Sequence, residues 1–376
     1  MKFFPNSFIA LNVHMLLGAT CFYIGGILSA TCITPYFYVY ILLSLAPIAG
    51  IISHVMGKKI PTGVLIVLAS FALGHIRYKQ QCSSFYHFYN NYQETAKAIK
   101  GVITTIEPVE HARMKQCAIL HLNELQTNTG DWKTIDVYIQ LYTPTINAWM
   151  VSDKVQINNI AIKKPLSESF LQYLIKEGLT STVFCLECDY ILIDRPEYSF
   201  YRWLFVAKQN VFQRLRNKMP AKSFALFSSL FLGNRSLNKQ TIDTLANQFK
   251  QWGISHYLAR SGLHLTIFAL IWHILFRLLP ICFLFKQAIL FALSIIYFAL
   301  SWPSVSFLRA FYSFLLCILC NMLSMRTHFL HILTLVTIFV LFFNPIQLFF
   351  LDFQLSFSLT FGLAWINHLY LACKTK

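Results

Sequence analysis

GISHYLARSGLH, at residues 253–264, opens a long apolar run that continues to about Leu279. A segment that enters lipid is expected to be apolar throughout, yet this one begins with ionisable side chains. His256, Arg260 and His264 are spaced by four residues and therefore form one stripe on a helix. Because ionisable groups are costly in the hydrocarbon core, they usually face a protein interior or a wet cavity. The stripe therefore predicts a polar path through a membrane protein.

The composition of the chain agrees with an integral membrane protein. Of its 376 residues, 56% are hydrophobic and only 12% are charged, whereas soluble domains carry about 25% charged residues. The net charge is +16, but residues 77–200 hold 12 basic and 13 acidic side chains, a net of −1. The excess of basic residues thus lies at the ends of apolar segments and in one local patch. The total net charge alone therefore does not indicate a nucleic-acid-binding surface.

Apolar segments predict about eight membrane spans, since several approach the roughly 20 residues that a spanning helix needs. They cover residues 8–30, 35–56, 60–76, 254–279, 287–303, 305–325, 329–343 and 346–372. The first lacks a clear small-residue cleavage site and is followed at once by another apolar run. We therefore interpret it as an anchor rather than a signal peptide.

Basic residues in the short loops predict one orientation. With a cytoplasmic N-terminus, all of them fall on the cytoplasmic side; they are Lys2, Lys58, Lys59, Arg277, Lys286, Arg326, Lys374 and Lys376. The loops at 31–34, 302–304 and 344–347 fall outside and contain neither Lys nor Arg. The region at about 77–200 is then extracytoplasmic.

The external region changes to short β-rich runs from Thr95 onward. Strands are expected at residues 98–106, 114–121, 134–141, 154–162, 182–186 and 190–193, with a helix at 167–176 that ends at Gly178. Alternation of apolar and polar residues is clearest at Ile135, Val137, Ile139 and Leu141. The whole pattern predicts a small OB-like β-barrel. Such barrels often bind single strands through aromatic and basic side chains. With a net charge of −1, a purely structural β-domain remains the alternative.

Four cysteines lie in this external region, where disulfides are chemically permitted. They are Cys82, Cys117, Cys185 and Cys188. The last two form a lone C-x-x-C without a second pair, so no metal site is expected, and spacing alone does not give the pairing.

A basic amphipathic segment follows the β-domain. Apolar residues recur at helical spacing, and the basic residues mostly occupy other positions; they are Arg202, Lys208, Arg214, Arg216 and Lys218. This pattern predicts an interfacial helix on anionic lipid, and the same charge suits a polyanion. Residues 221–232 are too few to span and predict a re-entrant or buried segment. An amphipathic stretch at 237–252 then leads into the opening motif.

The order of these motifs resembles the ComEC competence proteins, inner-membrane channels for DNA uptake in natural transformation. That family has a Gly-Asp-Arg-Ser-like turn, an amphipathic helix and Gly-x-x-His-x-x-Ala-x-Ser-Gly-Leu-His. This chain has GNRS at 233–236 and GISHYLARSGLH at 253–264. It also has Arg309-Ala310, Asn344-Pro345 and FQLSF at 353–357, where the family has Arg-Ala, Asn/Asp-Pro and Phe-Gln-Leu-Ser-Phe. The resemblance covers nearly all of the chain.

Three departures from the family pattern matter. Asn234 replaces the usual Asp, and Arg260 stands where the family usually has an apolar residue. The sequence stops soon after FQLSF, whereas family members continue with further helices and often a metallo-β-lactamase-like domain. The His-x-His-x-Asp-His motif of that domain does not occur. We therefore expect a truncated member, a fragment or one half of a split protein.

The sequence thus predicts a polytopic α-helical membrane protein of about eight hydrophobic segments with an inserted extracytoplasmic OB-like β-barrel domain. Its expected domains are N-terminal transmembrane helices at 1–76 and the β-domain at 77–200. Amphipathic and re-entrant interfacial segments follow at 201–252. A competence-type transmembrane helical domain, incomplete at its C-terminus, is expected at 253–376.

The resemblance implies an inner-membrane channel component for the uptake of single-stranded DNA. We expect the DNA path to use His256, Arg260, Ser261, Gly262, His264, Arg309, Asp352 and Gln354. The structural alternative pairs Asp352 with Arg309 or Arg260 and lets His264 bond a neighbouring helix. A catalytic triad drawn from the same His, Ser and Asp residues is a poor interpretation, because a triad is defined by geometry. No enzymatic activity, metal or cofactor is expected.

The alternatives to a channel are a non-conducting or split-protein scaffold of the competence machinery and a transporter of another polyanion. Expected partners are single-stranded DNA, anionic lipids and other competence proteins, with a separate chain supplying the missing helices in the split case. A homo-oligomer is left open.

Overall fold

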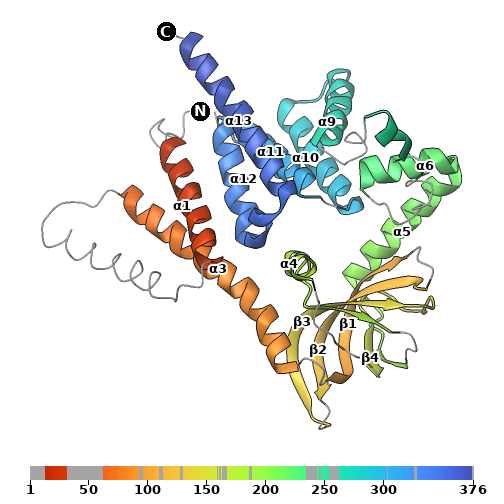
Figure 1. The fold of residues 1–376 in the computed structure, drawn as a ribbon. Helices are drawn as coiled ribbons and strands as arrows, with labels where there is room; N and C mark the ends of the chain where they lie inside the picture. Colours follow the sequence, from red (N-terminus) through yellow and green to blue (C-terminus); the bar gives the residue numbers. More distant parts are fainter. Residues whose placement is uncertain are drawn as a thin grey trace, which may run out of the picture. The chain divides into compact units, whose positions relative to one another are not determined.

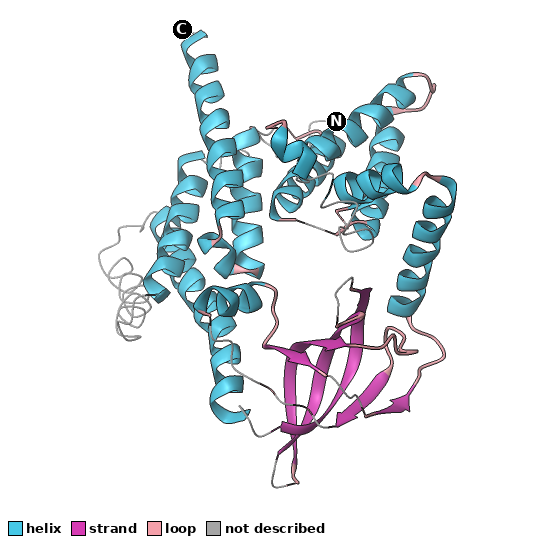
Figure 2. Ribbon diagram, turned by 45° about the vertical axis from the view of Figure 1, so that its right-hand side comes forward, coloured by secondary structure: helices cyan, strands magenta, loops and turns pink. Residues whose placement is uncertain are grey.

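The computed structural model divides the chain into two compact units. Figure 1 labels the helices and strands along the chain. Unit 1 comprises Met1–Gln81, Ser261–Ala299 and Pro303–Lys376, and unit 2 comprises Cys82–Arg260 and Leu300–Trp302. Residues described by the structure are 13–31, 62–92, 96–109, 113–127, 130–158, 160, 162, 167–185, 189–233, 244, 247–253, 262–302, 304–325 and 328–374. Helices predominate, and unit 2 adds a mixed β-sheet (Figure 2).

Unit 1 is built from apolar helices. They are α1 (Val13–Thr31), the first part of α3 (Thr62–Tyr92), α9 (Gly262–Arg277), α10 (Phe283–Leu300), α11 (Val305–Met322), α12 (Phe329–Phe343) and α13 (Leu351–Lys374), with the 3-10 turn η3 (Pro345–Phe349) before α13. Among the described residues, α10 and α11 are the two helices long and apolar enough to cross a membrane. The predicted segment at 35–56 lies outside the described residues, so the number of spans stays a prediction.

Helices α1 and α3 approach each other closely at two glycines. A Cβ atom on Gly26 would lie 2.0 Å from the backbone oxygen of Phe71. A Cβ atom on Gly74 would lie 2.3 Å from the backbone oxygen of Tyr23. Small residues at a crossing let helix backbones pack directly, as is common in membranes. Only glycine fits this crossing without a backbone shift.

Helix α3 is longer than the apolar segment predicted at 60–76. It continues through a polar stretch to Tyr92. After Gly74, the helix contains neither Gly nor Pro. Two aromatic side chains of this second half, Phe85 and Phe88, are 2% and 1% exposed. Phe88 belongs to the hydrophobic core of the β-sheet. This buried face holds the polar half of α3 as a helix, although its hydropathy alone indicated the start of a separate region.

Unit 2 contains a six-stranded sheet with the order β5-β3-β2-β1-β4-β6. Its strands are β1 (Ala96–Pro108), β2 (Gln116–Thr127), β3 (Trp132–Thr143), β4 (Lys154–Asn158), β5 (Ser181–Phe184) and β6 (Tyr190–Asp194). Neighbouring strands are antiparallel except β3 and β5, which are parallel. Each predicted strand is therefore confirmed, with boundaries shifted by a few residues.

The sheet is open rather than closed into a barrel. In its described part, β5 and β6 are the two edges and no pairing joins them. One face carries the core, in which Val137, Ile139 and Leu141 of β3 alternate with outward residues. The predicted alternation is confirmed, whereas the closed OB-like barrel is not shown.

Helical segments complete unit 2. The helix α4 (Glu168–Lys176) ends before Gly178, which has a φ of +70° and provides the predicted stop. The amphipathic segment forms α5 (Phe200–Lys218), followed by α6 (Ala221–Phe227) and the π-helix η1 (Ser228–Leu232). Gly233, in the left-handed conformation, caps η1.

Two cysteines of the β-domain have different states. Cys185 is disulfide-bonded, whereas Cys117 is a free, buried thiol. Burial raises the pKa of the Cys117 thiol above its ordinary value, which disfavours the reactive thiolate. Cys117 is therefore a packing residue.

Candidate functional site

The structure describes part of the predicted polar path. Outside the described residues lie His256, Arg260 and Ser261. The described path residues all belong to unit 1; they are Gly262, His264, Arg309, Asp352 and Gln354. The stripe as a whole stays a prediction. The described part of the site consists of the first turn of α9 and of residues on α11 and α13.

Gly262 is the point at which α9 begins and meets α11. A Cβ atom on Gly262 would lie 3.0 Å from the Cβ of Ala310, which is tighter than an ordinary contact. The two helices therefore approach each other closely at this glycine. His264, in the first turn of α9, is 8% exposed. The described end of the stripe is packed among helices.

Arg309 reaches from α11 to α13. Its Nη1 donates to the backbone oxygen of Ser356 and to Oγ1 of Thr360. Its guanidinium carbon lies 5.9 Å from the ring centroid of Phe357. Both hydrogen-bond acceptors are neutral, so the predicted alternative of an ion pair with Asp352 is not what the structure shows. Within the described part of the chain, the hydrogen bonds of Arg309 use Nη1. The N–H groups on Nε and Nη2 of Arg309 can therefore donate to a further acceptor.

The two polar residues at the start of α13 serve the local backbone. Asp352 Oδ1 accepts the N–H of Phe353 at 3.0 Å. Gln354 Nε2 donates to the backbone oxygen of Leu348 at 2.9 Å. Both side chains are exposed. An acidic residue in the first turn also suits the positive end of the helix dipole, so Asp352 stabilises the start of α13.

The Arg309-Ala310 dipeptide brings three motif segments together. Ala310 meets Gly262 at the start of α9, while Arg309 meets Ser356, within FQLSF, on α13. Neighbouring residues on a helix point about 100° apart, so one dipeptide contacts two different helices. The result is a half-buried cation beside a tight helix crossing. A cation in this position can make a weak contact with an anion.

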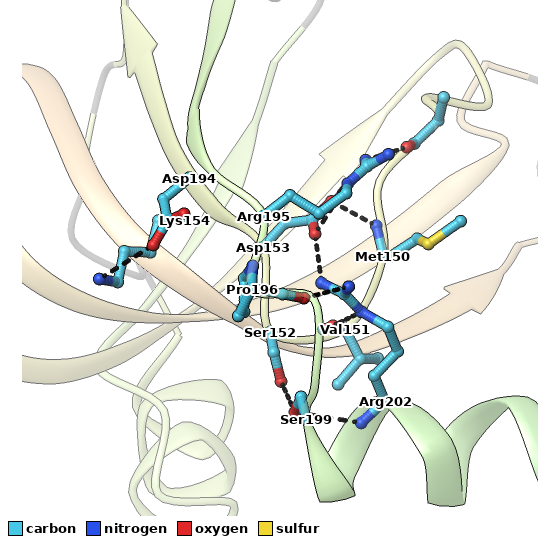
Figure 3. A network of polar contacts seen from close by, with 11 residues as sticks. Met150, Val151, Ser152, Asp153, Lys154, Asp194, Arg195, Pro196, Ser199 and Arg202 are labelled. Carbon is cyan, nitrogen blue, oxygen red and sulfur yellow. Dashed lines mark hydrogen bonds and ion pairs between the residues drawn. The ribbon is translucent and has the colours of Figure 1, made fainter.

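On α5, the predicted basic surface begins with Arg202, which the structure places inside unit 2 (Figure 3). Its Nη2 lies 2.7 Å from Oδ1 of Asp153, and its Nε donates to the backbone oxygen of Val151 at 3.0 Å. Arg195 Nη2 lies 2.7 Å from Oδ2 of the same carboxylate. The hydrogen bond to Asp153 raises the pKa of Arg195. The Arg202 charge thus anchors α5 instead of facing an external ligand.

The other basic residues of α5 divide into two groups. Lys208 Nζ lies 3.5 Å from the ring centroid of Trp302. By contrast, Arg214, Arg216 and Lys218 are exposed on the last turns of the helix. The predicted surface for lipid or polyanion therefore narrows to these last three side chains.

Sequence reasoning missed the residues that hold α5 in place. Asp153 carries no motif, and only its 0% exposure distinguishes it from the other acidic residues. Trp302 stood in a predicted external loop without an expected role. A run of basic residues with no acid nearby gave no signal that two of its members have distant partners.

Comparison with known protein families finds a match for the C-terminal part of the chain. Residues 230–376 match the family described as Competence protein. This region belongs to the competence protein family. Searches among curated proteins and among solved structures found no match. The match supports the resemblance to ComEC-type competence proteins and includes every described residue of the predicted path.

The competence domain carries two general implications. Its family suggests a role in DNA uptake for competence. The family and the apolar helices α10 and α11 together indicate a membrane protein.

Within the competence domain, Gly262→Ala is expected to lower the thermal midpoint of the detergent-purified protein. The new Cβ would lie 3.0 Å from that of Ala310, and overpacking of this kind costs about 1–3 kcal/mol. Gly362→Ala is the matched control, because nothing lies within 4 Å of a Cβ at that position of α13.

A double-mutant cycle isolates this contact. Ala310→Gly alone is expected to cost about 1 kcal/mol through helix propensity. In the double variant Gly262→Ala/Ala310→Gly, the opposing methyl group is gone, so the loss should be smaller than the sum of the single losses. Strict additivity would contradict the proposed packing of α9 on α11.

Proposed function

We propose that the protein is a component of an inner-membrane channel that takes up single-stranded DNA during natural transformation. The observation that carries the proposal is Arg309, which is half-buried in the competence domain and bonded to Ser356 and Thr360 of α13. Ionisable residues within membrane helices usually mark substrate pathways.

The chemistry of a passing strand fits this cation. Every nucleotide carries a negative charge, so a path needs cations and donors that bind weakly enough to release the strand. In the described part of the chain, the acceptors on Arg309 are a backbone oxygen and a hydroxyl. Neither cancels its charge, and a single guanidinium gives a contact that is readily exchanged. Gly262 and His264 lie on the helix packed beside it.

Two contacts support the multi-pass orientation with residues 77–200 and the loops 302–304 and 344–347 outside. Trp302 Nε1 donates to Oε1 of Glu107 on β1 at 2.6 Å. Gln81 Nε2 donates to Oδ1 of Asn344 at 3.0 Å. Groups within hydrogen-bond distance lie on the same side of a bilayer, and each contact joins two segments that the charge pattern also put on the same side.

Helix α5 supports a second contact of the protein, with anionic lipids. Phe200 and Trp203 are 68% and 65% exposed at its start, and Arg214, Arg216 and Lys218 are exposed at its end. Exposed aromatic and basic side chains on one helix are typical of interfacial binding. The same three cations are available to the phosphates of DNA before entry.

A gene deletion followed by uptake of labelled DNA tests the channel proposal. Cells lacking the protein should still bind DNA at their surface but accumulate no labelled strand in the cytoplasm, and expression of the wild-type chain should restore uptake. Unchanged cytoplasmic uptake would remove the proposal.

Reconstitution separates the channel from its alternatives. Liposomes that contain the channel component, with any partner competence proteins that co-purify, should admit a single-stranded oligonucleotide. A scaffold would be needed in cells yet admit nothing, and a transporter of another polyanion would admit that polymer without DNA. The same preparation reports whether the chain forms a homo-oligomer.

A further inference from the structure

Trp302, in the connection between α10 and α11, is held by several segments of unit 2. Its Nε1 donates to Oε1 of Glu107 at 2.6 Å, and its backbone N–H donates to the oxygen of Leu232 at 2.7 Å. Its ring packs edge-on against Phe212 with centroids 5.2 Å apart, and Lys208 Nζ lies 3.5 Å from the ring centroid. All of these residues belong to unit 2.

The two charged contacts on this indole reinforce each other. A hydrogen bond from N–H to a carboxylate is charge-assisted and pushes electron density onto the ring. A richer ring attracts the ammonium of Lys208 more strongly, because a cation–π contact depends on the negative face of the ring. Such chains of polar contacts polarise one another. Loss of the Lys208 contact therefore weakens the bond between Trp302 and Glu107 as well.

Lys208 shares its helix with the exposed cations Arg214, Arg216 and Lys218. A phosphodiester chain drawn to these three residues lies within a few helical turns of Lys208. An ammonium–phosphate pair is a charge-assisted contact, which is generally stronger than a contact with a neutral ring. Phosphate can therefore compete with the indole for this ammonium.

We propose that Trp302 is a latch on the α10–α11 connection and that a phosphodiester polyanion bound to α5 loosens it by withdrawing Lys208. In the sequence, two residues separate Trp302 from Val305, where α11 begins, and α11 is the helix that carries Arg309. Loosening of Trp302 thus frees one end of that helix when DNA arrives. This inference rests on the proposed function only in its choice of DNA as the polyanion.

Fluorine NMR of the full chain tests the latch. The protein is labelled with fluorotryptophan and placed in nanodiscs of neutral lipid, and the Trp302 resonance is identified by its absence in Trp302→Phe. Addition of single-stranded oligothymidylate should shift this resonance, and added salt should reverse the shift because phosphate contacts are screened. Lys208→Gln should start near the shifted position and respond little.

Matched variants decide between outcomes. The triple variant Arg214→Gln/Arg216→Gln/Lys218→Gln should show an unshifted Trp302 resonance at the same oligonucleotide concentration. A full shift in Lys208→Gln, or none in wild-type protein to which the oligonucleotide is bound by anisotropy, would overturn the latch. Neither result bears on DNA uptake by cells. The latch can therefore fail while the channel proposal stands, and the channel proposal can fail while the latch stands.

Discussion

Asp153→Ala is expected to destabilise unit 2 by about 3–5 kcal/mol, the cost of leaving a buried charge without its partner. The carboxylate is 0% exposed and accepts hydrogen bonds from Arg195, Arg202 and the N–H of Met150. Without it, the Arg202 side chain, which is 14% exposed, keeps its charge and loses its counter-ion. Denaturant unfolding of the detergent-purified full chain, followed by circular dichroism, measures the loss.

A surface pair of the same unit provides the control. Asp194 lies 3.4 Å from Lys154, and their side chains are 51% and 54% exposed. Exposed pairs of this kind contribute roughly 0–1 kcal/mol, so Asp194→Ala should change the free energy of unfolding little. Asp153→Asn, which keeps the size but not the charge, should fall between the two. If Asp153→Ala were as mild as Asp194→Ala, the cluster would not be what anchors α5.

Arg309→Gln is expected to lower cytoplasmic accumulation of labelled DNA by about ten-fold or more, equivalent to about 1.4 kcal/mol. Glutamine can still donate toward Ser356 and Thr360, but it removes the charge that the path offers to phosphate. Arg309→Lys keeps the charge and loses the planar fork, so an intermediate uptake is expected. Uptake assays with complemented deletion cells measure all three variants.

Arg277→Gln is the matched control for this prediction. Arg277 is an exposed cation in the last turn of α9 and lies at the predicted cytoplasmic end. Its loss should leave uptake near the wild-type level. Membrane abundance of each variant is measured in parallel. If Arg309→Gln reduced abundance as strongly as uptake, Arg309 would hold α11 to α13 and would have no separate role in the path.

Local pattern predicted most elements of the fold. The alternation of Val137, Ile139 and Leu141 predicted the inner face of β3, because a strand places successive side chains on opposite faces. Gly178 predicted the end of α4, because it allows the left-handed conformation found there. Where hydropathy and packing disagreed, packing prevailed. The polar half of α3 stays helical because Phe88 is buried against the sheet.

The candidate site was predictable in its residue types but not in its contacts. Motif order singled out Gly262 and Arg309 as residues of interest. Ala310 contacts Gly262, and Ser356 and Thr360 accept hydrogen bonds from Arg309. These contacts depend on the packing of helices that are distant in sequence. The same holds on α5, where Arg202 and Lys208 looked like their basic neighbours. A side chain's partner is set by which distant atoms come within about 3 Å, and periodicity carries no such information.

The sequence by itself determined the apolar helices, the strand segments and the order of the competence motifs. These features follow from the spacing of apolar residues and from turn chemistry, which act over a few neighbouring residues. Tertiary structure alone decided that the sheet is open, that Asp153 forms an ion pair with Arg202, and that Arg309 donates hydrogen bonds to neutral acceptors on α13. Each of these depends on packing between segments far apart in the chain, where burial and charge pairing set the free energy.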